Sequence, residues 1–340
     1  MDTILSVKDL AVEFATYGGT VKAVRGVSFD VTRGETLAIV GESGCGKSVT
    51  VQSLMGLIPM PPGRITNGTA TLNGKSILNL PAAEANKFRG VEIGMIFQDP
   101  MSSLNPTMTI GDQIAETLKV HRGKTDQEAF KIAVELLERT HIPEASKRAK
   151  QYPFEFSGGM LQRAMIAQSL ACNPAILIAD EPTTALDVTI QAQILELMLE
   201  LQRTENMSII LITHDLAVVA RMADRVAVMY AGQIIESGTV DDIFYRSSHP
   251  YTLGLKQAMP SNTHDRDKSL SPILGSPPDL FKPPVGCGYC ARCPYAMAVC
   301  AEHLPPTTKI SESHEARCWL HHAKAPNIEE LHQLEDQDAG

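Results

Sequence analysis

The stretch Gly41-Glu-Ser-Gly-Cys-Gly-Lys-Ser48 determines how the rest of the chain is interpreted. It fits the pattern G-x-x-x-x-G-K-[ST] of a phosphate-binding loop. The apolar run Glu35–Val40 precedes it and predicts a buried strand, and Val49–Leu57 follows with spacing typical of a helix. The alternative is a glycine-rich turn that fits the pattern by chance. The strand–loop–helix order favours the phosphate-binding loop.

The residue types of this loop suit a bound phosphate. Gly41, Gly44 and Gly46 allow backbone N–H groups to turn toward an anion, and the N-terminus of the next helix adds positive potential. Lys47 is expected to reach the β- and γ-phosphates of a nucleotide. The hydroxyl of Ser48 is expected to bind Mg²⁺.

Further nucleotide contacts are expected inside and before the loop. Cys45 and Val49 complete the expected contacts of the loop. A helix N-terminus lowers the pKa of a thiol, which could make Cys45 sensitive to alkylation, but we favour the alternative that Cys45 is a small residue tolerated there. Residues 4–32 alternate apolar and polar side chains, which predicts antiparallel strands. In that region Phe14 and Tyr17 could stack on a purine base, with core packing as the alternative for each.

Composition excludes several classes of protein. The chain has 340 residues, 44% of them hydrophobic, and a formal net charge of −9. An acidic chain is a poor candidate for general nucleic-acid binding, so we expect no nucleic-acid partner. The first residues do not resemble a signal peptide, and no apolar run approaches the ~20 residues of a membrane helix. We expect a soluble, intracellular protein that reaches a membrane only through partners.

Two further buried strands are followed by residues suited to phosphate chemistry. Ala175–Ala179 is fully apolar, which predicts a central strand, and Asp180 and Glu181 follow it directly. Paired carboxylates at the tip of a buried strand are costly unless they bind something. Asp180 is expected to hold Mg²⁺ and Glu181 to polarise an attacking water, with a solvated acidic pair as the alternative. His214 follows the apolar run Ser208–Thr213 and could contact a γ-phosphate or that water.

A largely helical part lies between these strands. The run Val91–Phe97 predicts a strand that ends at Gln98, and residues 110–148 show helical spacing. The stretch Phe156-Ser-Gly-Gly-Met160 then begins a helix to about Cys172. Its serine and glycines offer backbone donors to an anion, and a plain helix cap is the alternative.

Together these motifs resemble an ABC-type ATPase, over roughly residues 4–245. They occur in the order of that family: Gly41–Ser48 as Walker A, Gln98 as Q-loop, Phe156–Met160 as signature, Ile176–Glu181 as Walker B, Thr184–Asp187 as D-loop and His214 as switch histidine. The signature reads Phe-Ser-Gly-Gly-Met where the general family has Leu-Ser-Gly-Gly-Gln. This variant is usual in bacterial dipeptide/oligopeptide importers, which the chain also resembles in Phe97–Pro106, Asp180–Asp187 and His249–Thr252.

The resemblance implies a fold and a division of the chain. The fold is α/β, a P-loop NTPase of the ABC nucleotide-binding type, with an antiparallel β subdomain, a helical subdomain and a small Cys-rich C-terminal extension. The ATPase domain would span residues 1–245, with the helical insert at about 101–172. A linker would occupy 246–285, the Cys-rich region 286–322 and an acidic tail 323–340.

The resemblance also implies the site and its partners. Ser48, Gln98 and Asp180 would position Mg²⁺, and Glu181, His214 and Gln98 would act on the hydrolytic water and the γ-phosphate. A second ATPase subunit, expected to be a different chain, would complete the ATP site with its own counterparts of Ser157, Gly158, Gly159 and Asp187. Two membrane permeases and an extracytoplasmic binding protein would complete an importer. This chain would lie peripherally at the cytoplasmic face of the inner membrane.

Five cysteines crowd the C-terminal part of the chain. In a cytosolic protein such a cluster is more typical of metal binding than of disulfides, and Cys287-x₂-Cys290-x₂-Cys293 by itself echoes a ferredoxin run. The resemblance instead implies a [4Fe–4S] cluster on four cysteines and leaves Cys290 as an extra: Cys287, Cys293, Cys300 and Cys318. Zinc, and reduced or disulfide-bonded cysteines, remain alternatives.

The implied function is that of an ATP-hydrolysing subunit that powers peptide import. The same motor could serve another cargo, such as nickel chelates, antimicrobial peptides, glutathione or oligosaccharides, because the ATPase does not touch the cargo. A soluble ABC ATPase of DNA repair or of ribosomes is a further alternative. It would predict basic patches or tandem cassettes, whereas this chain has one cassette and an acidic balance.

Overall fold

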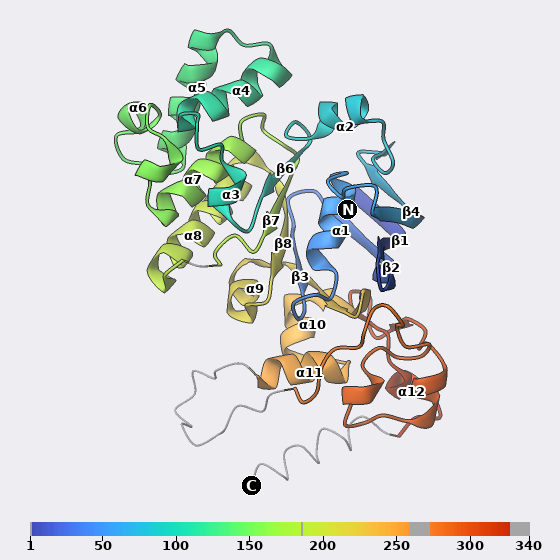
Figure 1. Cartoon of the computed structure of the whole chain (residues 1–340). Helices are drawn as coiled ribbons and strands as arrows, with labels where there is room; N and C mark the ends of the chain where they lie inside the picture. The colour runs from blue at the N-terminus through green and yellow to red at the C-terminus, as the bar shows by residue number, and fades with distance from the viewer. Residues whose placement is uncertain (1, 185, 259–272, 327–340) are drawn as a thin grey trace.

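The computed structural model describes residues 2–184, 186–258 and 273–326, and in this part of the chain the strands form two sheets (Figure 1). The smaller sheet is antiparallel, in the order β2-β1-β4-β5. Its strands are β1 (Thr3–Thr16), β2 (Gly19–Thr32), β4 (Gly63–Leu72) and β5 (Lys75–Ser76). The predicted antiparallel strands are therefore confirmed. Strand β4 lies in a region rich in glycine and proline, and Gly68 within it has a positive φ of 109°.

The larger sheet contains eight strands among the described residues, in the order β11-β12-β10-β9-β3-β8-β7-β6. Five of its strands, from β9 to β6, run parallel to one another. Every residue of β3, β7 and β8 is buried, because helices and the smaller sheet cover this part of the sheet. The bounds are β3 (Thr36–Val40), β6 (Ile93–Ile96), β7 (Ile176–Asp180), β8 (Ser208–Thr213), β9 (Arg225–Tyr230), β10 (Gln233–Thr239), β11 (Thr308–Lys309) and β12 (Glu315–Ala316).

The parallel direction of these strands sets the position of the functional residues. The carboxyl ends of β3, β6, β7 and β8 meet at one edge of the sheet. Ligands of open α/β sheets bind at such an edge. The phosphate-binding loop follows β3 there and leads into α1 (Lys47–Leu54).

A helical subdomain with its own apolar cluster lies to one side of the larger sheet (Figure 1). Local signals fix its helix ends: the hydroxyl of Thr125 and the carboxylate of Glu128 form a capping box, and Gly123 ends the preceding helix in the left-handed conformation. Its helices are α3 (Pro100–Ser103), α4 (Ile110–Arg122), α5 (Asp126–Arg139), α6 (Ala145–Arg148) and α7 (Gly158–Ser169), with the 3-10 turn η1 (Pro153–Glu155).

The remaining helices surround the sheets and the C-terminal region. They are α2 (Ala82–Phe88), α8 (Val188–Glu205), α9 (Leu216–Met222), α10 (Val240–Tyr245), α11 (Pro250–Gln257) and α12 (Ala298–Glu302), with the 3-10 turns η2 (Cys290–Arg292) and η3 (Trp319–His321). Within the described ranges, none of the helices combines the length and the apolar character required to cross a bilayer. Most of the expected acidic tail, 323–340, lies outside the described residues.

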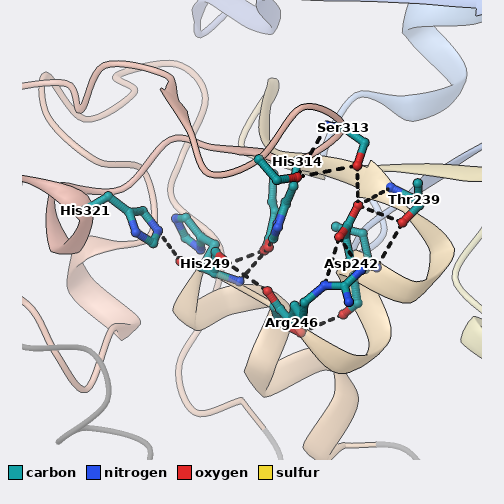
Figure 2. Close-up of polar contacts among 12 residues, drawn as sticks. Thr239, Asp242, Arg246, His249, Ser313, His314 and His321 are labelled. Carbon is teal, nitrogen blue, oxygen red and sulfur yellow. Dashed lines mark hydrogen bonds and ion pairs between the residues drawn. The ribbon is translucent and has the colours of Figure 1, made fainter.

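The C-terminal region joins the larger sheet instead of forming a separate Cys-rich extension. Strand β12 pairs antiparallel with β10, so the hairpin β11–β12 continues the sheet. Figure 2 shows Ser313 and His314 facing the start of α10, where the Ser313 hydroxyl donates to Asp242 (2.9 Å). So short a region has little core of its own, and it packs instead against the ATPase core, where Tyr289 shares an apolar cluster with Tyr230 and Tyr251.

Candidate functional site

The carboxyl-terminal edge of the parallel strands forms a pocket of about 460 Å³. The residues that line it come from the phosphate-binding loop, the start of α1, the interior of β2 and the segments that follow β6, β7 and β8. They are Ala23, Ser43, Gly44, Gly46, Lys47, Ser48, Val49, Gln98, Glu181 and His214. Most of the residues predicted to bind nucleotide or water therefore share one pocket.

The phosphate-binding loop needs glycine for steric reasons. At Gly41 (φ 152°) a side chain would meet the carbonyl oxygen of Met229, and at Gly46 (φ 105°) it would meet that of Ala23. The loop consequently follows the backbone of neighbouring strands closely. Lys47 is buried, and its Nζ donates to the carbonyl oxygens of Gly41 (2.8 Å) and Glu42 (2.9 Å). The ammonium thus lies directly under the loop.

Ser48, which lines the pocket, contacts Asp180 at the end of β7, and both are predicted Mg²⁺ ligands. The Ser48 hydroxyl donates to Oδ1 of Asp180 at 2.9 Å. Burial raises the pKa of Asp180, although the Ser48 hydrogen bond acts in the opposite direction. A hydroxyl beside a buried carboxylate is an oxygen donor set that suits Mg²⁺, and a cation there would favour the ionised carboxylate.

Glu181 is the centre of a polar cluster at the end of β7. Its Oε2 accepts from Gln98 Nε2 (2.9 Å), and its Oε1 lies 3.3 Å from His214 Nδ1. Oε2 also accepts from the Thr184 hydroxyl at 3.0 Å. This contact of Thr184 was not predicted from the sequence, although Thr184 lies only three residues after Glu181 and carries a hydroxyl that can donate to it. Glu181 has a left-handed backbone (φ 48°), which is strained for a residue with a side chain.

The two aromatic candidates for base stacking are not part of the pocket lining. Phe14 lies in β1 opposite Val21 and packs against the main apolar core, in keeping with the core alternative. Tyr17 is fully exposed at the turn between β1 and β2. Stacking by Tyr17 remains a prediction.

The environment of Cys45 favours the interpretation as a small residue tolerated in the loop over that of a reactive thiol. Its thiol is buried, and burial raises its pKa, even though the neighbouring Lys47 acts in the opposite direction. A helix N-terminus lowers the pKa of a thiol, but burial of Cys45 in the folded protein outweighs this effect. Cys45 is therefore a small packing residue in this arrangement.

The signature residues occupy the N-terminus of α7, away from the pocket of the same chain. Ser157 is the residue that precedes the helix, and Gly158 and Gly159 are its first two positions. A side chain at Gly159 would meet Ile190 Cγ2 at 2.8 Å, which shows how closely α7 and α8 approach. Asp187 begins α8 and accepts from the N–H of Ile190 (2.9 Å). None of these four predicted residues lines the pocket of its own chain.

Comparison with known proteins identifies the family. The profile described as "ABC transporter" matches residues 24–184, and the one described as "Oligopeptide/dipeptide transporter, C-terminal region" matches residues 235–300. The chain is 58% identical to the oligopeptide transport ATP-binding protein OppD of Bacillus subtilis, covering 96% of this chain and 91% of that protein. It is 55% identical to the dipeptide transport ATP-binding protein DppD of the same species, covering 96% and 97%.

The chain belongs to the ABC transporter family of oligopeptide and dipeptide transport ATP-binding proteins. Similarity to OppD of Escherichia coli, at 51% identity over 94% of this chain and 93% of that protein, agrees with this. Among solved structures, the ATP-binding cassette MJ0796 in a dimeric post-hydrolysis state with ADP and Pi has a TM-score of 0.62 at 27% identity. It covers 69% of this chain and 98% of its own, so this ABC ATPase has the predicted α/β nucleotide-binding fold.

The predicted metal centre is not preformed among the described cysteines of this ABC ATPase. Across the described ranges, no three His, Cys, Asp or Glu side chains are arranged to hold a metal ion. The five C-terminal cysteines nevertheless line one small pocket, and all are free. Burial raises the pKa of Cys287 to about 11 and the pKa values of Cys293 and Cys318 to about 12. Burial thus favours the neutral form of these three thiols as long as no cation lies beside them.

His249 also lines the cysteine pocket. Its side chain is buried, Nδ1 accepts from the N–H of Tyr251 (3.0 Å), and Nε2 has no hydrogen-bond partner. A buried polar atom without a partner costs free energy. The donor set around the pocket, several thiols and one unpartnered imidazole nitrogen, has the chemistry of a soft-metal or iron–sulfur site.

Proposed function

We propose that this chain is the ATP-hydrolysing subunit of an ABC importer of oligopeptides or dipeptides. The observation that carries the proposal is the meeting of Gln98, Glu181 and His214 beside the phosphate-binding loop. A carboxylate, an amide and an imidazole in contact at the mouth of a phosphate site suit hydrolysis of a nucleotide γ-phosphate. The peptide cargo is supported by the names of the relatives, which are oligopeptide and dipeptide transport proteins.

Each site residue has a separate part in the proposed reaction. Lys47 and the loop N–H groups bind the phosphates and offset their charge. Ser48, Asp180 and Gln98 would hold Mg²⁺, which would neutralise phosphate charge. Glu181 accepts a hydrogen bond from the attacking water and orients it toward the γ-phosphate. His214 contacts that phosphate from the end of β8.

The position of the signature residues supports a dimer in which each subunit completes the other's site. In such a dimer Ser157, Gly158, Gly159 and Asp187 contact the ATP of a second ATPase subunit, which we propose to be a different chain. The assembly includes two permeases and a binding protein, with this chain peripheral at the cytoplasmic face of the membrane. We retain residues 1–245 as the ATPase domain and 246–285 as the linker to the Cys-rich region.

The cysteine pocket is proposed to hold a [4Fe–4S] cluster on Cys287, Cys293, Cys300 and Cys318. The shared pocket and the unpartnered nitrogen of His249 support this. Iron and sulfide analysis of anaerobically purified protein, with a visible absorbance spectrum, tests the assignment. Stoichiometric zinc without iron would contradict it.

The Glu181→Gln variant tests the proposed reaction. In the assembled transporter we expect ATP turnover to fall at least about 100-fold, because general-base assistance of this kind contributes roughly 10²–10⁴-fold. ATP binding should persist, since the amide keeps the shape of the side chain. Glu196→Gln, an exposed change on α8, is the matched control. Undiminished turnover in Glu181→Gln would rule out Glu181 as the catalytic carboxylate.

A further inference from the structure

Glu42, the second residue of the phosphate-binding loop, is bound by the C-terminal part of the chain. Its carboxylate accepts two hydrogen bonds from Arg292: Nη1 to Oε2 at 2.7 Å and Nη2 to Oε1 at 3.0 Å. Its backbone N–H donates to the hydroxyl of Tyr251 at 2.9 Å. Side chains separated by more than 200 residues in sequence thus hold one residue of the ATP site.

The Arg292–Glu42 pair differs from an ordinary surface ion pair. The Arg292 side chain is only 6% exposed, and its fork engages both carboxylate oxygens. Exposed pairs contribute little to stability, whereas buried, two-pronged arginine–carboxylate pairs fix geometry as well as charge. The contact can therefore determine where the loop lies.

Arg292 is itself held in place by other groups. Nε donates to the carbonyl oxygen of Leu274 (3.0 Å), Nη2 to that of Ile273 (3.2 Å), and Nη1 to the hydroxyl of Tyr230 (3.2 Å). Because several anchors fix the guanidinium, it cannot follow Glu42 freely if the loop moves. The position of Arg292 is imposed by the C-terminal fold, since it ends η2, which begins at Cys290.

Three tyrosine rings pack against one another beside the Arg292–Glu42 pair. The ring of Tyr230 lies 4.5 Å from that of Tyr251 and 5.4 Å from that of Tyr289, and the rings of Tyr251 and Tyr289 are also 5.4 Å apart. All three are buried. They come from β9, α11 and the segment before η2, so this packed aromatic group joins the ATPase core to the C-terminal region.

Glu42 also contacts Lys47, the residue proposed to bind the phosphates. The carbonyl oxygen of Glu42 accepts a hydrogen bond from Lys47 Nζ at 2.9 Å. A shift of Glu42 would therefore displace a partner of Lys47 within the loop. Placement of the ammonium depends on the same residue that Arg292 and Tyr251 hold.

We propose that Arg292 and Tyr251 are positioning residues for ATP binding, through which the C-terminal region braces the phosphate-binding loop at Glu42. The proposal rests on ATP binding at this pocket and extends it to residues outside the ATPase motifs. The brace keeps the loop in its phosphate-binding shape before nucleotide arrives. A loop that is already ordered costs less free energy to order when ligand binds. Removal of the contacts that Arg292 and Tyr251 make with Glu42 therefore weakens affinity for ATP.

Equilibrium binding of a fluorescent ATP analogue to the full-length chain tests the brace. We expect Arg292→Gln and Glu42→Gln each to weaken binding about tenfold, which corresponds to about 1.4 kcal/mol. Because both changes break one contact, the double variant should bind about as well as either single variant. Arg292→Lys keeps the charge without the fork and should lie between wild type and Arg292→Gln. Arg221→Gln, which breaks the exposed pair with Glu196, should leave affinity unchanged.

A second, more conservative variant separates loss of the contact from loss of the fold. Tyr251→Phe keeps the ring in its aromatic group and removes only the oxygen that accepts from Glu42, so a loss of about threefold is expected. In the assembled transporter, Arg292→Gln should raise KM for ATP with little change in kcat, because Arg292 does not touch the reacting atoms. Wild-type affinity in folded Glu42→Gln and Tyr251→Phe would overturn the proposal. If the wild-type chain itself bound no ATP, the proposed function would fail instead.

Discussion

Glu181 combines a strained backbone with a side chain that is already engaged by several groups. Gln98, Thr184 and His214 contact its two oxygens. A carboxylate held by three neighbours has little freedom to rotate, so its orientation toward an incoming water is set before nucleotide binds. The strain at φ 48° is consistent with a position retained for function, since strained backbone concentrates at active sites.

Asp242 leads to a prediction about acid stability. Burial alone would raise its pKa, but hydrogen bonds from Thr239, Arg246 and Ser313 outweigh burial and lower the pKa well below its usual range (Figure 2). A carboxylate with a lowered pKa in the folded state stabilises the fold above its unfolded pKa of about 3.9, and this stabilisation is lost as pH falls below that value.

Asp242→Asn should therefore be less stable than wild type at neutral pH, and this difference should shrink below about pH 4. Urea unfolding at a series of pH values measures both effects. Asp241→Asn, a change at the exposed neighbouring residue, is the control and should follow the wild-type curve. An Asp242→Asn curve that stays parallel to wild type down to acid pH would contradict the assignment.

At the residue scale, the sequence was most informative where a rule depends on neighbours along the chain. The predicted roles at Lys47 and Ser48 correspond to residues that line the pocket. Whether Cys45 is reactive could not be decided from the loop alone, because the burial that raises its thiol pKa comes from distant parts of the chain. Whether Phe14 stacks on a base or packs in the core could likewise not be decided from the sequence, because only its register with β2 shows that it packs against the core.

At the scale of elements, the buried strands were predictable because each is a short apolar run. Strands β3, β7 and β8 and the residues after them follow the predicted order, and parallel pairing brings their ends together. The pairing of β12 with β10 could not be predicted. Two-residue strands have no periodic pattern, and the partners lie far apart in sequence.

Glu236 joins three elements and leads to a prediction about stability. It is buried in β10, where Oε1 accepts from the N–H of Ser248 (2.6 Å) and lies 2.8 Å from His314 Nε2, while Oε2 accepts from the N–H of His249 (3.0 Å). The carboxylate thus ties the main sheet to the start of α11 and to the C-terminal hairpin.

Glu236→Ala should lower the free energy of unfolding by about 3 kcal/mol, because it leaves buried donors without an acceptor. Chemical denaturation of the full-length chain measures the change. Glu315→Ala, at an exposed position of β12, should cost less than about 0.5 kcal/mol. Equal effects of the two substitutions would show that the buried network is not responsible.

At the scale of the molecule, the ATP pocket and the signature residues lie apart in one chain. Ser157 and the two glycines do not line the pocket that holds Lys47 and Glu181. Two chains in a head-to-tail arrangement would bring the signature residues of one chain to the ATP pocket of the other. This separation is the structural basis for expecting hydrolysis to depend on association.

Ser157→Arg tests that dependence. Because Ser157 lies outside the pocket of its own chain, nucleotide affinity of the isolated subunit should stay within about twofold of wild type, a difference of under about 0.5 kcal/mol. ATP-driven association, measured by light scattering in the Glu181→Gln background, should be lost through steric overlap and charge. The same change at exposed Ser76 in β5 is the control. Normal association of Ser157→Arg would exclude this surface from the dimer contact.

The pairing of β12 with β10 also has a consequence for biosynthesis. A ribosome completes β10 roughly 75 residues before it completes β12, which at 5–20 residues per second is a delay of about 4–15 s. During that interval one side of β10 has no strand partner, and open strand edges invite pairing with other chains. The nascent chain therefore presents an open edge of β10 for several seconds after all of its ATPase motifs have been synthesised.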